Sequence, residues 1–246
     1  MAFLHCEIFS KTLNMATAVN VILPDKGALC DANTVYLLHG LSDNCTGWMR
    51  YTSVERYARE RGIAVIMPEV QRSFYADMAY GLPYFTYISE ELPALCRRMF
   101  SLSAEREKNY VFGLSMGGYG ALRCALLCPD RYTGAASFSG VCDAPWTIAS
   151  HPDKPLHENE IAAIFGDEKA VPPKDDLFVM AERLSGKAPE LYISCGEQDD
   201  LLESNGRFAE HLSSLGIAHR FEHWPGIHSW DFWDASLQKA LAYFFD

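Results

Sequence analysis

The sequence lacks the segments that would carry a chain into or across a membrane. It has no uninterrupted run of about 18 apolar residues, which argues against a transmembrane helix. Its first ten residues contain no basic stretch followed by an apolar one, the pattern of a secretory signal peptide. We therefore expect a cytoplasmic protein.

Patterns typical of metal sites and disulfide frameworks are also missing. The eight cysteines are scattered along the chain, and no CxxC pair occurs among them. Cys124 and Cys128 are one helical turn apart, without a histidine or further cysteine at ligand spacing, which favours small core residues over zinc ligands. We expect reduced thiols, no metal and no other cofactor.

Basic residues are scarce relative to acidic ones. The chain has 21 Lys and Arg against 32 Asp and Glu, a formal net charge of −11. Nucleic acids and anionic membranes bind basic surfaces, so this balance argues against both as partners. A small-molecule substrate is the expected partner, and the composition leaves open whether copies form a homo-oligomer.

Hydrophobic residues make up 49% of the 246 residues, enough for one large core. After two N-terminal strand-like segments, apolar strand-like runs alternate with amphipathic helix-like ones. This alternation predicts an α/β fold with a mostly parallel sheet, antiparallel N-terminal strands and helices on both faces. Pro93 is expected to kink or break one helix. We expect strands at 3–9, 15–23, 34–38, 63–67, 109–114, 134–139, 190–195 and 219–223, and helices at 52–61, 84–100, 117–128, 201–215 and 231–245.

One serine lies in a glycine-rich turn, in the segment Gly113-Leu114-Ser115-Met116-Gly117-Gly118 between an apolar strand and a helix. A tight strand-to-helix turn lifts a serine off the sheet, where a histidine can reach its hydroxyl. The glycines two residues to either side lack a Cβ, which lets the strand and helix approach each other closely. This nucleophile elbow predicts that Ser115 is a catalytic nucleophile.

A cluster of carboxylates follows the buried strand expected at 190–195. The next residues are Gly196-Glu197-Gln198-Asp199-Asp200, at the edge where open α/β sheets hold their sites. We interpret Asp199 as the acid that orients a catalytic histidine, with Glu197 and Asp200 as alternatives. Asp200 is expected to cap the helix that follows.

The candidate histidine is His228, in a loop between the last strand and the C-terminal helix. A histidine in such a loop can reach Ser115. His211, on a predicted helix, and His219 and His223, on one strand face, are the alternatives, although such positions more often hold surface or core residues. The chain order Ser, Asp, His is that of α/β-hydrolases.

The apolar strand expected at 34–38 runs into His39-Gly40-Leu41-Ser42-Asp43. We expect the backbone N–H groups of Leu41 and Met116 to form an oxyanion hole, in which one donor typically contributes about 2.7–4 kcal/mol. His39 is interpreted mainly as a structural residue that holds this loop by hydrogen bonds.

The segment 141–189 interrupts the alternation of strands and helices. It is rich in proline and acidic residues and contains two expected short helices, 158–165 and 176–185. It is either a cap over a substrate pocket or a plain surface insertion. We treat residues 1–246 as a single domain with a cap-like insertion.

Six segments together resemble one group of enzymes, from about Thr34 to the C-terminus: HGLSDNCTGW, MPEVQRSFYADMAYG, GLSMGGYGA, SFSG, CGEQD and GIHSW. The group contains tributyrin esterase and S-formylglutathione hydrolase (esterase D), together with feruloyl and acetyl xylan esterases and mycolyltransferases. The formylglutathione enzymes carry Ser-Gly-Leu-Thr-Cys where this chain has His-Gly-Leu-Ser-Asp. In this respect and in its shorter length the chain is more similar to the tributyrin esterase branch.

The resemblance implies an α/β-hydrolase fold and a serine carboxylesterase that hydrolyses small, short-chain acyl or aryl-acyl esters through an acyl-serine intermediate. It implies Ser115, Asp199 and His228 as the triad and Leu41 and Met116 as the oxyanion amides. An S-formylglutathione-type thioester hydrolase or an acyltransferase would use the same triad. A non-catalytic binding module would be expected to lack the serine or histidine.

Large aromatic residues cluster in the loops expected around Ser115, and most of them should be core residues. A subset is expected to line a pocket for a short acyl chain or a cinnamoyl ring. The residues named as candidates for substrate binding are His39, Trp48, Tyr75 and Trp146.

Overall fold

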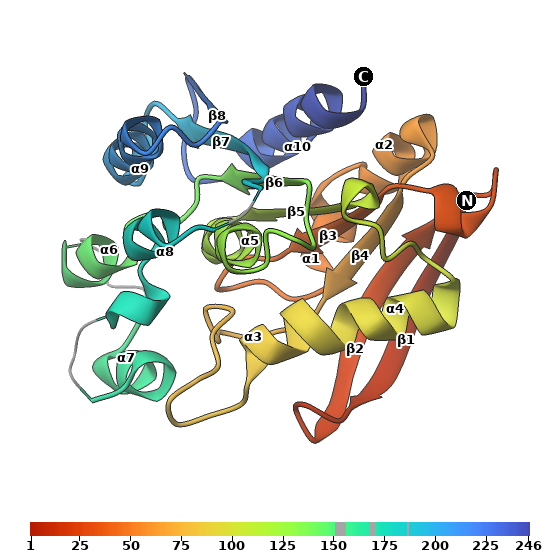
Figure 1. Cartoon of the computed structure of the whole chain (residues 1–246), viewed down its shortest axis with the longest axis horizontal. Helices are drawn as coiled ribbons and strands as arrows, with labels where there is room; N and C mark the ends of the chain where they lie inside the picture. The colour runs from red at the N-terminus through yellow and green to blue at the C-terminus, as the bar shows by residue number, and fades with distance from the viewer. Residues whose placement is uncertain (151–155, 168–170, 186) are drawn as a thin grey trace.

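One mixed sheet forms the centre of the molecule in the computed structural model, which describes residues 1–150, 156–167, 171–185 and 187–246 (Figure 1). Within these residues eight strands run in the order β1-β2-β4-β3-β5-β6-β7-β8. The β1–β2 and β2–β4 pairs are antiparallel, and all the other neighbours are parallel. The strands are β1 (Ala2–Ser10), β2 (Met15–Leu23), β3 (Thr34–Leu38), β4 (Ala64–Pro68), β5 (Asn109–Leu114), β6 (Gly134–Phe138), β7 (Glu190–Gly196) and β8 (His219–Trp224).

The predicted α/β fold is confirmed, and each strand begins and ends within one residue of its expected bounds. The strands were recognisable because every residue of β3, β4 and β6 is buried. Strands covered by helices on both faces are apolar along their whole length, which is how these segments appear in the sequence.

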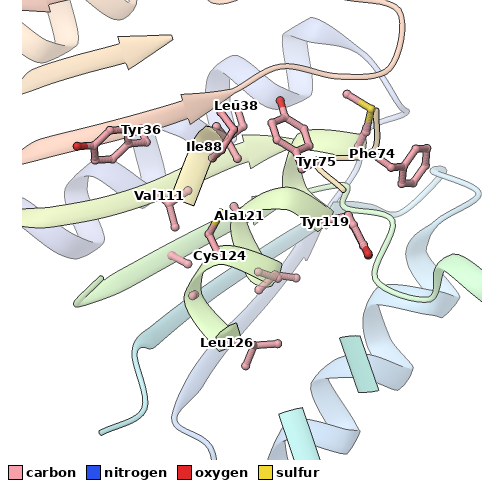
Figure 2. Packing of buried hydrophobic residues seen from close by; sticks show 14 of the residues in the cluster. Tyr36, Leu38, Phe74, Tyr75, Ile88, Val111, Tyr119, Ala121, Cys124 and Leu126 are labelled. Atoms are coloured by element: carbon pink, nitrogen blue, oxygen red, sulfur yellow. The ribbon is translucent and has the colours of Figure 1, made fainter. Parts of the chain in front are cut away.

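Two hydrophobic cores lie on opposite faces of this sheet. Along β3, Tyr36 and Leu38 pack into one core, and Val35 and Leu37 pack into the other. Figure 2 shows side chains of the first core, where residues of the sheet pack against α5. The helices that pack into the first core are α4 (Leu92–Phe100), α5 (Met116–Leu127), α8 (Leu177–Glu182) and α9 (Leu202–Ser214). The helices that cover the other face of the sheet are α1 (Gly47–Tyr51), α2 (Val54–Arg61) and α10 (Trp230–Phe245).

The helix expected at 84–100 is divided into three parts. These are α3 (Tyr84–Thr86), a π-helical turn (Tyr87–Glu91) and α4, whose first turn contains Pro93. Proline has no N–H to donate to the carbonyl four residues earlier, and its ring crowds that carbonyl. The wider π turn directly before α4 accommodates this, so the predicted effect of Pro93 is confirmed.

The sequence did not predict two short helices, α1 and α6 (Ala144–Ser150). At the start of α6 the Trp146 N–H donates to Asp143 Oδ1 at 2.9 Å, and Pro145 occupies the first turn. Aspartate followed by proline is a known start signal, and it could have revealed this helix.

The segment between β6 and β7 contains α6, α7 (Glu158–Phe165), a 3₁₀ turn (Pro173–Asp175) and α8. The two helices expected here, 158–165 and 176–185, correspond to α7 and to the shorter α8. Residues 151–155, 168–170 and 186 of this insertion lie outside the described residues. Among the helices that the structure describes, none has the length and apolar character needed to cross a membrane.

Candidate active site

Ser115 lies between the end of β5 and the start of α5, as the elbow pattern predicts. Its backbone has φ 52° and ψ −117°, a strained conformation for a residue with a Cβ. A Cβ on Gly113 would lie 2.2 Å from Gly117 O, and one on Gly117 would lie 2.5 Å from Leu38 O. Gly113 is therefore required for the strand and helix to meet around the serine, and Gly117 is required for the helix to pass close to the end of β3.

The structure brings the three residues expected to form a triad into one chain of hydrogen bonds. His228 Nε2 lies 3.0 Å from Ser115 Oγ, and His228 Nδ1 lies 2.9 Å from Asp199 Oδ2. Because a carboxylate faces Nδ1, that nitrogen carries the proton, and Nε2 is free to accept the serine hydroxyl proton.

The side chain of Asp199 is almost completely buried, with 1% of its surface exposed. Burial tends to raise the pKa of this carboxyl, but the hydrogen bond and charge of His228, together with the Leu201 N–H, hold it below its ordinary value. A charged carboxylate hydrogen-bonded to Nδ1 stabilises the protonated, positively charged form of the His228 ring.

The alternative acids and histidines lie elsewhere. Glu197 faces His223 at 3.2 Å, and Asp200 lies exposed in the lining of the cavity beside Ser115. His211 and His219 face backbone carbonyls, of Phe178 and Ile217 respectively.

The expectation that Asp200 caps α9 was wrong. Leu201 occupies the N-cap position of α9, and among the described residues no side chain caps the helix. The Leu201 N–H donates to Asp199 Oδ1 at 3.0 Å, so the carboxylate that holds His228 also fixes the residue before the helix. The tight turn after β7 points Asp199 back toward the backbone and leaves Asp200 exposed.

Leu41 and Met116, the two residues expected to form an oxyanion hole, both line the cavity beside Ser115. Among the hydrogen bonds of the described residues, neither backbone N–H has an acceptor. Backbone N–H groups beside a cavity are rarely left unpaired, and here they are available to a carbonyl oxygen.

The cavity at Ser115 has a volume of about 560 Å³ and a mainly apolar wall. Five residues of the insertion contribute to it, so the sheet edge and the insertion enclose the same space. The lining consists of Gly40, Leu41, Ser42, Asp43, Arg72, Phe74, Leu114, Ser115, Met116, Val141, Thr147, Ile148, Leu156, Ile161, Asp199, Asp200, Leu201, His228 and Trp233.

None of the four residues named for substrate binding belongs to this lining. Trp48 is buried and donates from Nε1 to Leu38 O, and Tyr75 is buried and donates from its hydroxyl to His39 O. His39 is also buried, between the Gly40 carbonyl and the Val70 N–H. Trp146 packs its ring against the Arg207 guanidinium. These side chains support the surrounding loops.

Sequence reasoning missed several residues that do line the cavity. Ile148 and Ile161 belong to the insertion, and Trp233 on α10 packs edge-on against the His228 ring, 4.9 Å between centroids. Asp43 also lines the cavity, where burial raises the pKa of its carboxyl above its ordinary value. The aliphatic residues carry no local signal, because any apolar position on a short helix suits a core equally well.

A serine, a histidine and a buried carboxylate joined at the carboxyl edge of a mostly parallel sheet are the arrangement of a serine hydrolase with the α/β-hydrolase fold. Residues 10–244 match the model of the Esterase family, described as "Putative esterase". The chain therefore belongs to the Esterase family and is a carboxylic ester hydrolase.

Similar proteins agree with this assignment. An acetyl esterase from Caldicellulosiruptor saccharolyticus is 30% identical, with 98% of this chain and 97% of that protein covered. The structure of the fluorophosphonate-binding serine hydrolase F of Staphylococcus aureus, with substrate bound, is 35% identical in sequence and has a TM-score of 0.92. The match covers 100% of this chain and 98% of that protein's chain. The S-formylglutathione hydrolase of the same organism is 34% identical with a TM-score of 0.89, at 100% and 99% coverage. Together with the family, these likenesses show a serine carboxylesterase.

Proposed function

We propose that Ser115 is the nucleophile of this esterase, that His228 is its general base and acid, and that Asp199 orients the imidazole. The observation that carries the proposal is the pair of hydrogen bonds at His228, 3.0 Å to Ser115 Oγ and 2.9 Å to Asp199 Oδ2. A nucleophile in contact with a base, and a base in contact with an orienting carboxylate, are the geometric requirements of acyl transfer.

The reaction proceeds in two halves. Ser115 Oγ attacks the ester carbonyl carbon as its proton moves to His228 Nε2, and the carbonyl oxygen becomes an oxyanion held by the N–H groups of Leu41 and Met116. His228 then returns the proton to the departing alcohol, which leaves an acyl-serine. Water activated by His228 attacks this ester, and Ser115 regains its proton when the acid leaves.

The substrate class proposed is small esters with short acyl chains, as in the tributyrin esterase branch of the family. A cavity of about 560 Å³ with a mainly apolar wall accommodates a small acyl group beside the serine. The relative named acetyl esterase supports the same class. A second candidate is thioester hydrolysis, which the relative named S-formylglutathione hydrolase favours.

The insertion is proposed to act as one wall of the acyl pocket within a single domain. The residues of the insertion that line the cavity are Val141, Thr147, Ile148, Leu156 and Ile161, all between β6 and β7.

We also propose a cytoplasmic location. The eight cysteines carry free thiols, the state that a reducing compartment maintains.

Turnover of a nitrophenyl acetate substrate tests the catalytic assignment. Ser115→Ala and His228→Ala are each expected to lower kcat by about 10⁶, and the double variant is expected to be little worse, because the residues act as a unit. Near-normal turnover by Ser115→Ala would contradict the proposal.

The substrate class is tested with nitrophenyl esters from acetyl to decanoyl, beside methyl ferulate and S-formylglutathione. We expect the highest kcat/KM on the shortest acyl groups. A higher kcat/KM on S-formylglutathione than on any ester would favour the second candidate.

A further inference from the structure

The loop that carries His228 has little burial to hold it in place. Residues 225–229 connect β8 to α10, and Ile227 exposes 58% of its surface next to the histidine. Pro225 and His228 are exposed as well. Apart from the packing of the His228 ring on Trp233, polar contacts therefore contribute most to placing this loop.

Gln198 makes two hydrogen bonds to one residue of this loop. Its side-chain Oε1 accepts from the Gly226 N–H at 2.8 Å, and its backbone N–H donates to Gly226 O at 2.9 Å. Both polar groups of Gly226 are thus paired with the same residue. The approach is close, since a Cβ on Gly196 would lie 2.3 Å from Gly226 O.

Gln198 directly precedes Asp199, and Gly226 stands two residues before His228. The dipeptide Gln198-Asp199 therefore holds the loop at two points, through the backbone at Gly226 and through the imidazole at His228. We infer that Gln198 is a positioning residue for the esterase reaction, which sets the loop so that His228 Nδ1 meets Asp199 and Nε2 meets Ser115.

A short loop has few free torsions once one of its residues is fixed. With Gly226 fixed, only the backbone of Ile227 and the torsions of His228 remain to place the ring. Without the Oε1 acceptor, the Gly226 N–H turns to solvent water, and Gly226 keeps only the single bond from the Gln198 N–H. The ring then spends less time in the geometry that accepts the serine proton, and small misplacements lower the rate of the chemical step more than the affinity for substrate.

The closing experiment compares two substitutions of similar size. Gln198→Met removes the acceptor, whereas Gln198→Glu retains an oxygen that accepts from the Gly226 N–H. We expect Gln198→Met to lower kcat about 5- to 10-fold with KM nearly unchanged, the effect of losing one hydrogen bond of ordinary net strength. Gln198→Glu should retain most of the activity. The control is Glu197→Met, an exposed neighbour bonded to His223, which should leave kcat unchanged.

A second readout does not depend on turnover. The proton on His228 Nδ1, held between two partners, is expected to give a downfield proton NMR signal in the wild type that is absent from His228→Gln. The signal should broaden or vanish in Gln198→Met and persist in Gln198→Glu and Glu197→Met. Equal kcat values and equal signals in Gln198→Met and the wild type would overturn the inference.

The inference rests on the proposed function, and the two can fail separately. An inactive wild type that shows the His228 signal, lost in Gln198→Met, would contradict the proposed reaction and support the positioning role. An active wild type indifferent to Gln198→Met would contradict only the positioning role.

Discussion

At the scale of single residues, two histidines show how surroundings determine chemistry. His39 is completely buried, donates from Nδ1 to Gly40 O at 2.8 Å and accepts the Val70 N–H at Nε2 at 3.2 Å. Burial lowers the pKa of His39, so the ring stays neutral and holds the loop that leads to Leu41. His228 is exposed, with one nitrogen on a buried carboxylate and the other on the half-buried Ser115 hydroxyl, the surroundings that the proposed exchange of protons requires.

The substitution Asp199→Asn tests the role of the imidazole tautomer. The Leu201 N–H donates to Oδ1, so an asparagine would keep its oxygen there and turn its NH₂ toward His228 Nδ1. The imidazole would then carry its proton on Nε2 and could not accept one from Ser115. We expect kcat to fall by about 10⁴.

Two measurements accompany this variant. Its thermal unfolding should stay close to that of the wild type, because the hydrogen bond to Leu201 and the shape of the side chain are kept. A kcat within tenfold of the wild type would show that Asp199 is not the orienting group.

At the scale of elements, the insertion is attached to α5 and to the loop after β4 by polar contacts. On α5, Arg123 forms a buried ion pair with Asp175 at 2.5 Å, and Tyr119 donates to Asp175 O at 2.6 Å. On α7, Glu160 pairs with Arg72 at 2.6 Å. Deleting residues 150–185 would remove Asp175 together with α8, which packs on α5, so the deletion would also uncover part of the core. Single substitutions therefore test the insertion more cleanly than deletion.

A change at Ile161 on α7 tests whether the insertion limits the acyl chain. Ile161→Trp fills part of the cavity, so longer acyl chains lose room. Since each buried methylene contributes about 0.8 kcal/mol, the ratio of kcat/KM for octanoyl over acetyl nitrophenyl esters should fall at least about tenfold. The matched control is Asn159→Trp, on the exposed face of the same helix. Equal chain-length profiles in both variants would contradict the proposal that the insertion forms one wall of the acyl pocket.

At the scale of the whole molecule, the mixed sheet brings distant segments to one edge, where β3, β5 and β7 end in the loop that carries Leu41, the elbow at Ser115 and the turn at Asp199. The loop after β3 is held by His39, whose titration is linked to folding. Burial lowers the pKa of His39 in spite of the nearby Glu69 and Asp43, which favour its charged form. A histidine whose pKa is lower in the folded than in the unfolded chain stabilises the fold at pH values above its ordinary pKa. This stability is lost as the pH falls below that pKa.

Thermal unfolding against pH tests this linkage. Between pH 7.5 and 5.5, across the ordinary histidine pKa of 6.5, the wild type should lose stability with a slope of up to about 1.4 kcal/mol per pH unit from this one proton. His39→Gln should have a lower Tm at pH 7.5 and a flatter dependence on pH. The same slope in both proteins would show that His39 does not carry the effect.

The sequence alone determined where the strands lie along the chain. For β3, β4 and β6 the reason is that strands covered on both faces must be apolar along their length, and that pattern is local. It also determined the turn at Ser115, since Gly113 is required by a contact within the motif itself, with Gly117 O. Pro93 likewise acts on its own helix.

Only the tertiary structure decided which aromatic residues stay away from the cavity and which aliphatic residues of the insertion reach it. Trp48 and Tyr75 are buried against β3 and its loop, whereas Ile148 and Ile161 line the cavity beside Ser115. It also gave Asp199 the Leu201 N–H and gave Gln198 a partner in the His228 loop. These outcomes depend on contacts between segments far apart in the chain, and an apolar or polar side chain carries no mark of which distant segment will pack against it.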